Sequence, residues 1–356
     1  MTVEISWFGA LCDDDYEYLG VPEEERLSSY PHCSDIVLAA DRLGFDNILL
    51  PSGYTLGIDT IAFASAVAPQ VKNMQLLTAV RVGEMWVPQL ARQLATIDQM
   101  LDGRLTINII SSDIPGQTLE SGPRYQRTRE WMHVLRELLD GNAVDFHGDF
   151  LELELEPPRL RTASRTSPPF YFGGFSPAAK DTAAEYADVF LTWPDTVAGV
   201  KATVDEMRDR AAGYDRELKY GLRAHVIVRE TEAEARAAAD RLVSRLDPDT
   251  GQKIKSKSLD TQSAGVARQN ELRETAADDG YAEANLWTGV GRARSGAGAA
   301  IVGDPDQVVA KLEAYQDVGI GAFVLSGYPH REEAERFAEM VLPRLDHGRL
   351  FERVSV

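Results

Sequence analysis

The sequence of 356 residues has only two cysteines, Cys12 and Cys33, too few and too unpatterned for a disulfide framework or a metal site. No apolar run reaches the roughly 18 residues that a membrane-spanning helix needs. The first residues lack the basic and apolar regions of a secretory signal. Basic residues are also few. The chain has 37 Lys and Arg and 56 Asp and Glu, which gives a formal net charge of −19. This balance argues against nucleic acid and membrane surfaces as partners, so we expect a cytoplasmic protein that binds neither.

Several signatures of enzyme classes are missing as well. There is no G-x-S-x-G elbow, no P-loop and no H-x-H or H-E-x-x-H spacing. The six histidines are scattered, so we expect no metal site. The acidic run Asp13–Asp15 is typical of a solvent-exposed loop.

What the sequence does contain is an alternation of short apolar runs with longer segments of helical period, which indicates a parallel sheet with crossover helices. A polar hairpin at 144–154 interrupts the alternation. Eight strands mostly separated by helices predict an α/β fold, a (β/α)8 TIM barrel. An open doubly wound sheet is the alternative, but no G-x-G-x-x-G follows the first strand. The predicted strands are 3–8, 47–50, 75–80, 105–110, 170–172, 189–192, 220–229 and 322–325.

The pattern contains no sign of a second domain, so we predict one domain spanning 1–356. The alternation fails at about 247–299, a polar and glycine-containing stretch with no clear strand and some helix near 266–275. Such long insertions are usually functional lids or disordered. We place this one between the seventh and eighth strands.

In barrels of this type the active site lies at the carboxyl ends of the strands. Arg223 and His225 are two residues apart on the seventh strand and therefore share one face. A buried arginine needs a strong acceptor, so Arg223 predicts either an internal ion pair or a ligand anion. Tyr328 follows the eighth strand as a hydrogen-bond donor, whereas His330 and Arg331 are expected to be exposed.

Other candidates follow the fourth, fifth and sixth strands. In the turn 173–177, Gly174 lets the backbone approach a ligand, and Ser176 precedes a helix whose free N–H groups favour a phosphate. A plain turn is the alternative. Asn108 and Ser112, near the end of the fourth strand, suit a polar heterocycle, and a satisfied amide in the core is the alternative for Asn108. Trp193 suits either an aromatic wall or core packing.

The segment 289–298 is rich in glycine and carries Arg292 and Arg294. A mobile segment that brings a guanidinium over an anionic site is a reasonable lid, because closure also expels water. A flexible surface loop is the alternative.

Taken together, these segments resemble the bacterial luciferase-like flavin monooxygenases, and specifically the alkanesulfonate monooxygenases that use reduced FMN. The resemblance covers nearly the whole chain. The segments that carry it are Trp7-Phe8, AADRLGF, ARQLATIDQMLDGR, YFGGFSPAA with LTW, GLRAHVIVRE, NLWTGVGRARSGAGAAIVGD and VLSGYPH.

The resemblance implies a TIM barrel that forms a homodimer or homotetramer and receives reduced FMN (FMNH2) from a separate NAD(P)H-dependent flavin reductase. With O2, such enzymes cleave the C–S bond of a sulfonate and release an aldehyde and sulfite. The implied flavin contacts are Asn108, Ser112, Tyr125, Gly174 and Ser176. The implied groups around the reacting atoms are Arg223, His225, Arg294 and Tyr328.

Two departures lie on the substrate side. The sulfonate enzymes typically carry cysteine in the loop after the second strand, where this chain has Leu56, and Pro-Thr-His after the first strand, where it has Ala10-Leu11-Cys12. We therefore expect Cys12, Leu56 and Trp193 to contact the substrate. The alternatives are a monooxygenase for another small molecule such as a sulfone or an amine, an oxidoreductase that uses the deazaflavin F420 on the same barrel, and a flavin-binding protein without turnover.

Overall fold

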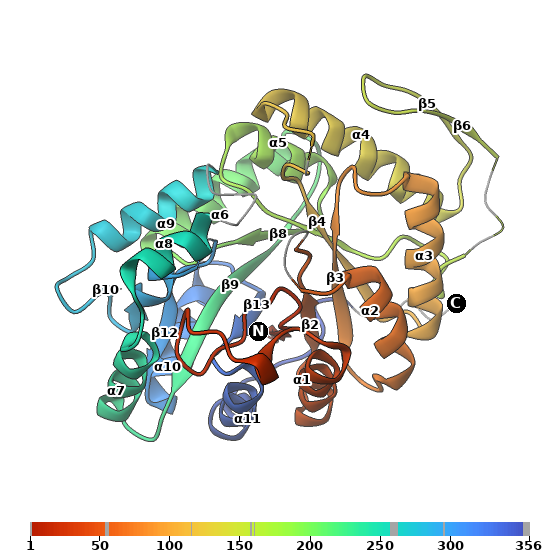
Figure 1. The fold of residues 1–356 in the computed structure, drawn as a ribbon. Helices are drawn as coiled ribbons and strands as arrows, with labels where there is room; N and C mark the ends of the chain where they lie inside the picture. Colours follow the sequence, from red (N-terminus) through yellow and green to blue (C-terminus); the bar gives the residue numbers. More distant parts are fainter. Residues whose placement is uncertain are drawn as a thin grey trace.

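Eight parallel strands close into a barrel in the computed structural model, which describes residues 2–53, 57–114, 116–156, 159, 161–256, 263–294 and 296–351 (Figure 1). Each strand pairs with the next one around the ring, and β1 pairs with β13 to close it. The predicted barrel is therefore confirmed. The barrel strands are β1 (Glu4–Phe8), β2 (Asn47–Leu50), β3 (Gln75–Arg81), β4 (Leu105–Ile110), β7 (Phe170–Phe172), β8 (Val189–Thr192), β9 (Lys219–Val228) and β13 (Ala322–Ser326).

Helices surround the strands, and local signals in the sequence set their ends. Ser29 caps the first helix by accepting a hydrogen bond from the N–H of His32, and Gly44 ends the helix with a φ of 91°, which favours glycine. A hairpin of β5 (Val144–His147) and β6 (Glu152–Leu155) projects from the edge of the molecule in Figure 1. The surrounding helices are α1 (Tyr30–Leu43), α2 (Thr60–Val67), α3 (Val87–Met100), α4 (Ser121–Asp140), α5 (Pro177–Tyr186), α6 (Val197–Ala212), α10 (Pro305–Asp317) and α11 (His330–Met340).

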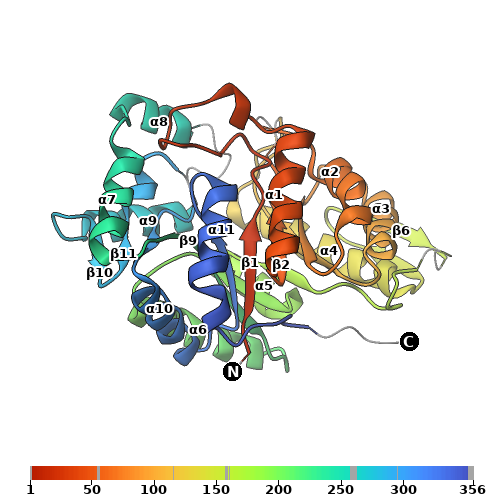
Figure 2. The ribbon, with the colours of Figure 1, turned by 90° about the horizontal axis from the view of Figure 1, so that it is seen from below.

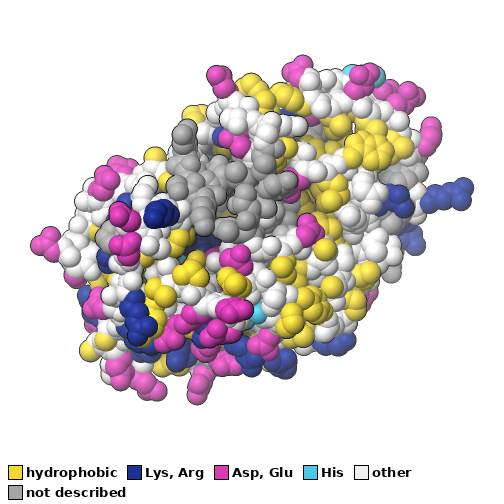
Figure 3. Space-filling view, viewed as in Figure 1, with side chains coloured by type: hydrophobic (Ala, Val, Ile, Leu, Met, Phe, Trp, Pro, Cys, Tyr) yellow, Lys and Arg dark blue, Asp and Glu magenta, His cyan; other side chains and the backbone are white. Residues whose placement is uncertain are grey.

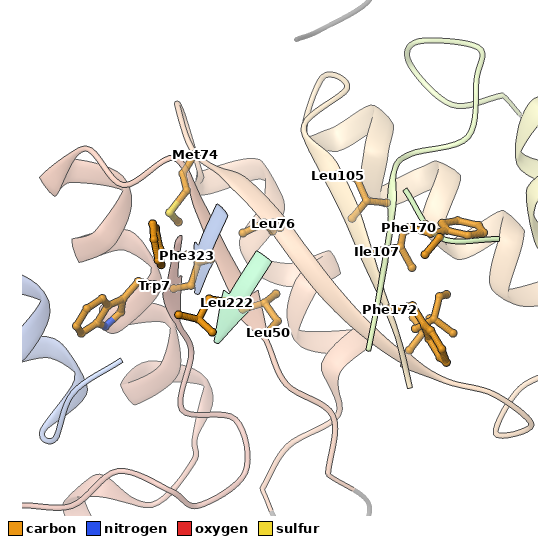
Figure 4. Close-up of a cluster of buried hydrophobic side chains, with 14 of the residues drawn as sticks. Trp7, Leu50, Met74, Leu76, Leu105, Ile107, Phe170, Phe172, Leu222 and Phe323 are labelled. Atoms are coloured by element: carbon orange, nitrogen blue, oxygen red, sulfur yellow. The ribbon is translucent and has the colours of Figure 1, made fainter. Parts of the chain in front are cut away.

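The hydrophobic core lies mainly between the strands and the helices (Figure 4). Because side chains alternate along a strand, one set from each strand packs outward. Trp7 of β1 illustrates this set, since its ring lies 5.2 Å from that of Phe45 and 6.1 Å from that of Phe337 on α11. A smaller cluster that includes Phe8, Leu77 and Tyr171 comes from the alternate positions of the strands.

The chain between β9 and β13 forms α7 (Glu232–Val243), α8 (Pro248–Ser256), α9 (Ala264–Glu274), β10 (Tyr281–Glu283), β11 (Leu286–Trp287) and β12 (Ala300–Gly303). β12 runs parallel to the end of β9, where Ala300 pairs with His225, and β11 and β10 continue antiparallel. The expectation that 247–299 holds no strand is therefore wrong for 281–287. Strands of two or three residues are too short to show a hydrophobic period.

This insertion lies beside the segment that follows β1, at the end of the barrel opposite the N-terminus (Figure 2). The N–H of Leu19 donates to the carbonyl of Leu242 at 2.8 Å. A Cβ on Gly20 would lie 2.8 Å from the Leu246 side chain, so the close approach requires glycine there. The insertion therefore packs against the carboxyl ends of the strands, where a barrel carries its site.

Acidic and basic side chains are interspersed around the face seen in Figure 3. None of the helices in the described ranges has the length and apolarity needed to cross a membrane. Over the same ranges, no group of three or more His, Cys, Asp or Glu side chains is arranged to hold a metal ion.

Candidate active site

Two guanidinium groups share the ring of Phe8 at the carboxyl end of β1. The Cζ of Arg223, from β9, lies 4.4 Å from the ring centre, and the Cζ of Arg294, from the insertion, lies 5.3 Å from it. Arg223 is buried. Within the described part of the chain, the carboxylate that contacts this pair is Asp14, which lies 2.7 Å from Arg294. Two positive charges beside one negative charge leave the cluster suited to an anion.

The contacts of Arg223 decide between the two interpretations of its burial. Its Nη1 donates to the carbonyl of Ala224 at 2.6 Å, and its Nη2 donates to the hydroxyl of Ser326 at 2.8 Å. Burial, together with the neighbouring charge of Arg294, lowers the pKa of Arg223 to about 9. The predicted internal ion pair is not found among the described residues. The guanidinium thus retains the need for an anion that a buried arginine has.

His225 belongs to a hydrogen-bonded chain that starts at Arg223. The carbonyl of Ala297 lies 3.1 Å from Nε2 of His225 and can only accept, so Nε2 carries the proton. Nδ1 then accepts from the hydroxyl of Ser326 at 2.7 Å. Burial and the charge of Arg223 hold the pKa of His225 well below its usual value. His225 is therefore neutral, and both of its ring nitrogens are occupied.

Ser326, which no sequence signal singles out, is the link in this chain. We expect Ser326→Ala to lower the free energy of unfolding by about 1–3 kcal/mol, because it leaves Nη2 of Arg223 and Nδ1 of His225 without this buried partner. Urea unfolding measures the effect. Ser65→Ala is the control, since its hydroxyl donates to a carbonyl on its own helix. Equal stability of the two variants would contradict the role given to Ser326.

Tyr328 connects His225 to Arg294. Its ring stacks on that of His225 with the ring centres 5.2 Å apart, and its hydroxyl accepts from Nη1 of Arg294 at 2.7 Å. Burial raises the pKa of Tyr328 to about 12, so the hydroxyl keeps its proton at neutral pH. Burial alone would lower the pKa of Arg294, but Tyr328 and Asp14 raise it. The four residues predicted around the reacting atoms therefore form one continuous cluster.

A second buried pair lies next to this cluster. Asp15 accepts from the backbone N–H of His330 at 2.8 Å and lies 3.0 Å from its Nδ1, while its other oxygen lies 3.0 Å from Nε2 of His32. Burial would raise the pKa of Asp15, but the hydrogen bonds from His32 and His330 hold it well below the usual value. The expectations that Asp13–Asp15 lies in solvent and that His330 is exposed are wrong. Asp15 and His330 are far apart in the sequence, so no local pattern predicts their contact.

Three of the residues predicted to hold the flavin come together where β7 ends. A Cβ on Gly174 would lie 3.5 Å from the hydroxyl of Tyr125 and 2.5 Å from the Cβ of Ala179, so glycine is required at this approach. Ser176 caps α5 by accepting from the N–H of Ala179 at 3.2 Å. Asn108 is half-buried on β4, opposite Tyr171 of β7. Ser112 is buried and accepts from Arg81.

The charges near this turn test whether it fits a flavin phosphate. The guanidinium of Arg124 lies 5.3 Å from the centre of the Tyr125 ring. The Nε atoms of Arg124 and Arg127 are buried and have no hydrogen-bond partner among the described residues. Burial lowers the pKa of Arg127. Arg124 lies 3.5 Å from Asp113 but keeps its buried Nε without a partner, so its charge beside Tyr125 fits the phosphate of FMN.

The residues predicted to contact the substrate are placed only in part. Cys12 is half-buried, and burial together with the charge of Asp14 raises the pKa of its thiol. The Trp193 ring lies 5.9 Å from that of Phe175, and a Cβ on Gly265 of α9 would lie 2.7 Å from it. Trp193 therefore packs between the barrel and the insertion. Leu56 lies outside the described residues.

Two related proteins are similar in sequence to this chain over almost its entire length. A sulfoquinovose monooxygenase from Novosphingobium aromaticivorans is 59% identical over 98% of this chain and 98% of its own. A sulfoquinovose monooxygenase from Agrobacterium fabrum is 49% identical over 96% of this chain and 89% of its own.

Solved structures share the fold at lower identity. A riboflavin lyase has a TM-score of 0.79 and 14% identity, with 97% of this chain and 91% of that chain covered. A long-chain alkane monooxygenase has a TM-score of 0.78 and 17% identity, with 99% and 93% covered. The family model described as Luciferase-like monooxygenase matches residues 18–322. The predicted resemblance is thus confirmed, and the chain belongs to the luciferase-like monooxygenases, a family of flavin-dependent enzymes.

Proposed function

We propose that this protein uses reduced FMN and O2 to cleave the C–S bond of a sulfonated sugar such as sulfoquinovose. The observation that carries the proposal is the pair of guanidinium groups of Arg223 and Arg294 on the ring of Phe8, with one carboxylate to balance two positive charges. A sulfonate supplies the missing negative charge. The names of the two relatives at 59% and 49% identity support the same substrate.

The reaction balances as R–CH2–SO3⁻ + O2 + FMNH2 → R–CHO + HSO3⁻ + FMN + H2O. The bound flavin supplies the two electrons and activates O2 for transfer of one oxygen atom to the carbon that bears sulfur. The chain's own residues bind and orient the reactants. In this proposal Tyr125, Gly174 and Ser176 hold the phosphate of FMN, and Asn108 and Ser112 lie along the flavin.

On the substrate side, Arg223 and Arg294 bind the sulfonate, and Tyr328 donates a hydrogen bond from its protonated hydroxyl. Neutral His225 fixes the insertion relative to Arg223. One of its ring nitrogens contacts Ser326, which also binds Arg223, and the other contacts the carbonyl of Ala297 in the insertion. The insertion, which we treat as part of one domain over 1–356, covers the site and excludes water. Cys12 and Trp193 line the remaining substrate side.

The proposal also includes partners. Reduced FMN comes from a separate NAD(P)H-dependent flavin reductase, which places the reaction in the cytoplasm, where NAD(P)H is supplied. The working form is a homodimer or homotetramer.

The test supplies photoreduced FMN and O2 to the purified protein with sulfoquinovose, alkanesulfonates, sulfones and amines, and measures sulfite and aldehyde. The proposal predicts that both products appear in equal amounts with sulfoquinovose. Oxidation of a sulfone or amine without any release of sulfite from sulfonates would favour the other substrate classes. Binding of FMN with no product from any compound would favour a flavin-binding protein without turnover.

Arg294 should act mainly after the insertion has closed over the substrate. We expect Arg294→Ala to lower kcat by about 10- to 100-fold, because it removes a charge-assisted contact that is made in the closed site. Steady-state sulfite release measures kcat and KM separately. Arg292→Ala is the matched control, because Arg292 lies in the same segment and is exposed. Unchanged kinetics of Arg294→Ala would remove Arg294 from the site.

A further inference from the structure

The two carboxylate oxygens of Asp14 have different environments. Oδ2 accepts a hydrogen bond from Nη1 of Arg294 at 2.7 Å. Oδ1 is buried and has no hydrogen-bond partner among the described residues. A buried carboxylate oxygen without a donor is costly, so such an atom is unusual unless a ligand supplies the donor.

The groups around Asp14 are almost all donors. Arg223 and Arg294 can only donate, and Tyr328 already accepts from Arg294. Both ring nitrogens of His225 are occupied by Ser326 and Ala297. Oδ1 of Asp14 is therefore the acceptor that this cluster offers to a ligand. The other oxygen of the same carboxylate, Oδ2, is bonded to Arg294, one of the two arginines that bind the sulfonate in the proposed function.

A simple alkanesulfonate has acceptor oxygens only and could not use Oδ1. A sugar sulfonate has both an anionic head and hydroxyl groups that donate. We propose that Asp14 selects hydroxylated sulfonates by accepting a hydrogen bond from a substrate hydroxyl at Oδ1 while Oδ2 keeps Arg294 in place. This inference rests on the proposed function. It gives a physical role to the loop after β1, the loop in which this chain departs from the Pro-Thr-His of the alkanesulfonate enzymes.

The selection can be separated from the anchoring of Arg294 by Asp14→Asn. The amide oxygen of asparagine can still accept from Arg294, but its NH2 group then takes the place of Oδ1 and cannot accept. Glu17→Gln is the matched control, because it removes the same charge from the same loop at a side chain that pairs with Arg241 outside the cluster. Both variants are assayed with sulfoquinovose and with 1-hexanesulfonate for release of sulfite. Where turnover of a compound is too slow, its affinity is measured as a competitive inhibitor.

We expect Asp14→Asn to lower kcat/KM for sulfoquinovose by about 10- to 100-fold, the range for a lost hydrogen bond to a charged group, and to change the value for hexanesulfonate by less than about threefold. Glu17→Gln should change neither value. Equal losses on both compounds would show that Asp14 only anchors Arg294 and would overturn the inference, as would an unchanged value for sulfoquinovose. Failure of the unaltered protein to release sulfite from either compound would instead refute the proposed function.

Discussion

Replacement of Arg223 by methionine is expected to lower kcat/KM for sulfoquinovose by about 100- to 1000-fold, which lies within the roughly 2–5 kcal/mol expected for removing one partner of a buried charged contact. Methionine fills the volume of the arginine stem but donates no hydrogen bond. The kcat/KM of Arg223→Lys should lie between those of the unaltered protein and Arg223→Met, because lysine restores the positive charge but not the planar set of N–H donors. The measurement is sulfite release with photoreduced FMN.

The same substitution should leave the protein at least as stable as before. Burial and the charge of Arg294 lower the pKa of Arg223 to about 9, so its positive charge is less favourable in the folded protein than in the unfolded chain. Because Arg223 has no carboxylate partner, its removal breaks no ion pair and should not lower the free energy of unfolding. Loss of both activity and stability would mean that Arg223 is structural, and a change in kcat/KM of less than threefold would place it outside the site.

The second large effect is expected at Asp15, on stability rather than on a direct contact with substrate. Asp15→Ala should lower the free energy of unfolding by about 3–5 kcal/mol, because it leaves the buried His330 and the neighbouring His32 without their shared carboxylate. Guanidinium unfolding measures the change. Asp145→Ala on the exposed hairpin is the control and should change the stability by less than about 0.5 kcal/mol. A similar small change at Asp15 would contradict this role.

The pH dependence of stability provides an independent check on Asp15. Its pKa is lower in the folded protein than in the unfolded chain, so its contribution is present above the unfolded pKa of about 3.9 and is lost as pH falls toward the folded value. Below pH 4 the difference in stability between the unaltered protein and Asp15→Ala should shrink. A difference that stays constant down to pH 2 would show that the carboxylate charge does not matter.

The sequence was sufficient to predict the barrel because its signals are local. Each predicted barrel strand is a short apolar run beside a helix that is bounded by residues such as Gly44 or Ser176, and all eight are found. The strands of the insertion were missed because β10 and β11 have three and two residues, so no period can form. Their pairing depends on the end of β9, where Ala300 lies beside His225.

Some residues of the candidate site could likewise be predicted from local patterns in the sequence, and others could not. The position of Arg223 and His225 on one face of a strand follows from alternation along the chain, and the structure brings both to Tyr328 and Arg294. The roles of Phe8, Asp14 and Ser326 could not be predicted, because each depends on contacts across the barrel between segments far apart in the sequence. In the sequence, Asp14 and Asp15 are typical of a solvent-exposed acidic loop. Only the structure shows that they contact Arg294 and His330.

A crystal structure of the protein with FMN and sulfoquinovose bound would show whether Arg223 and Arg294 hold the sulfonate. We expect the phosphate of FMN at the turn of Gly174 and Ser176, and sulfonate oxygens about 3 Å from the guanidinium nitrogens of Arg223 and Arg294. A structure that places the sulfonate away from both arginines, or the phosphate away from the N-terminus of α5, would contradict this expectation.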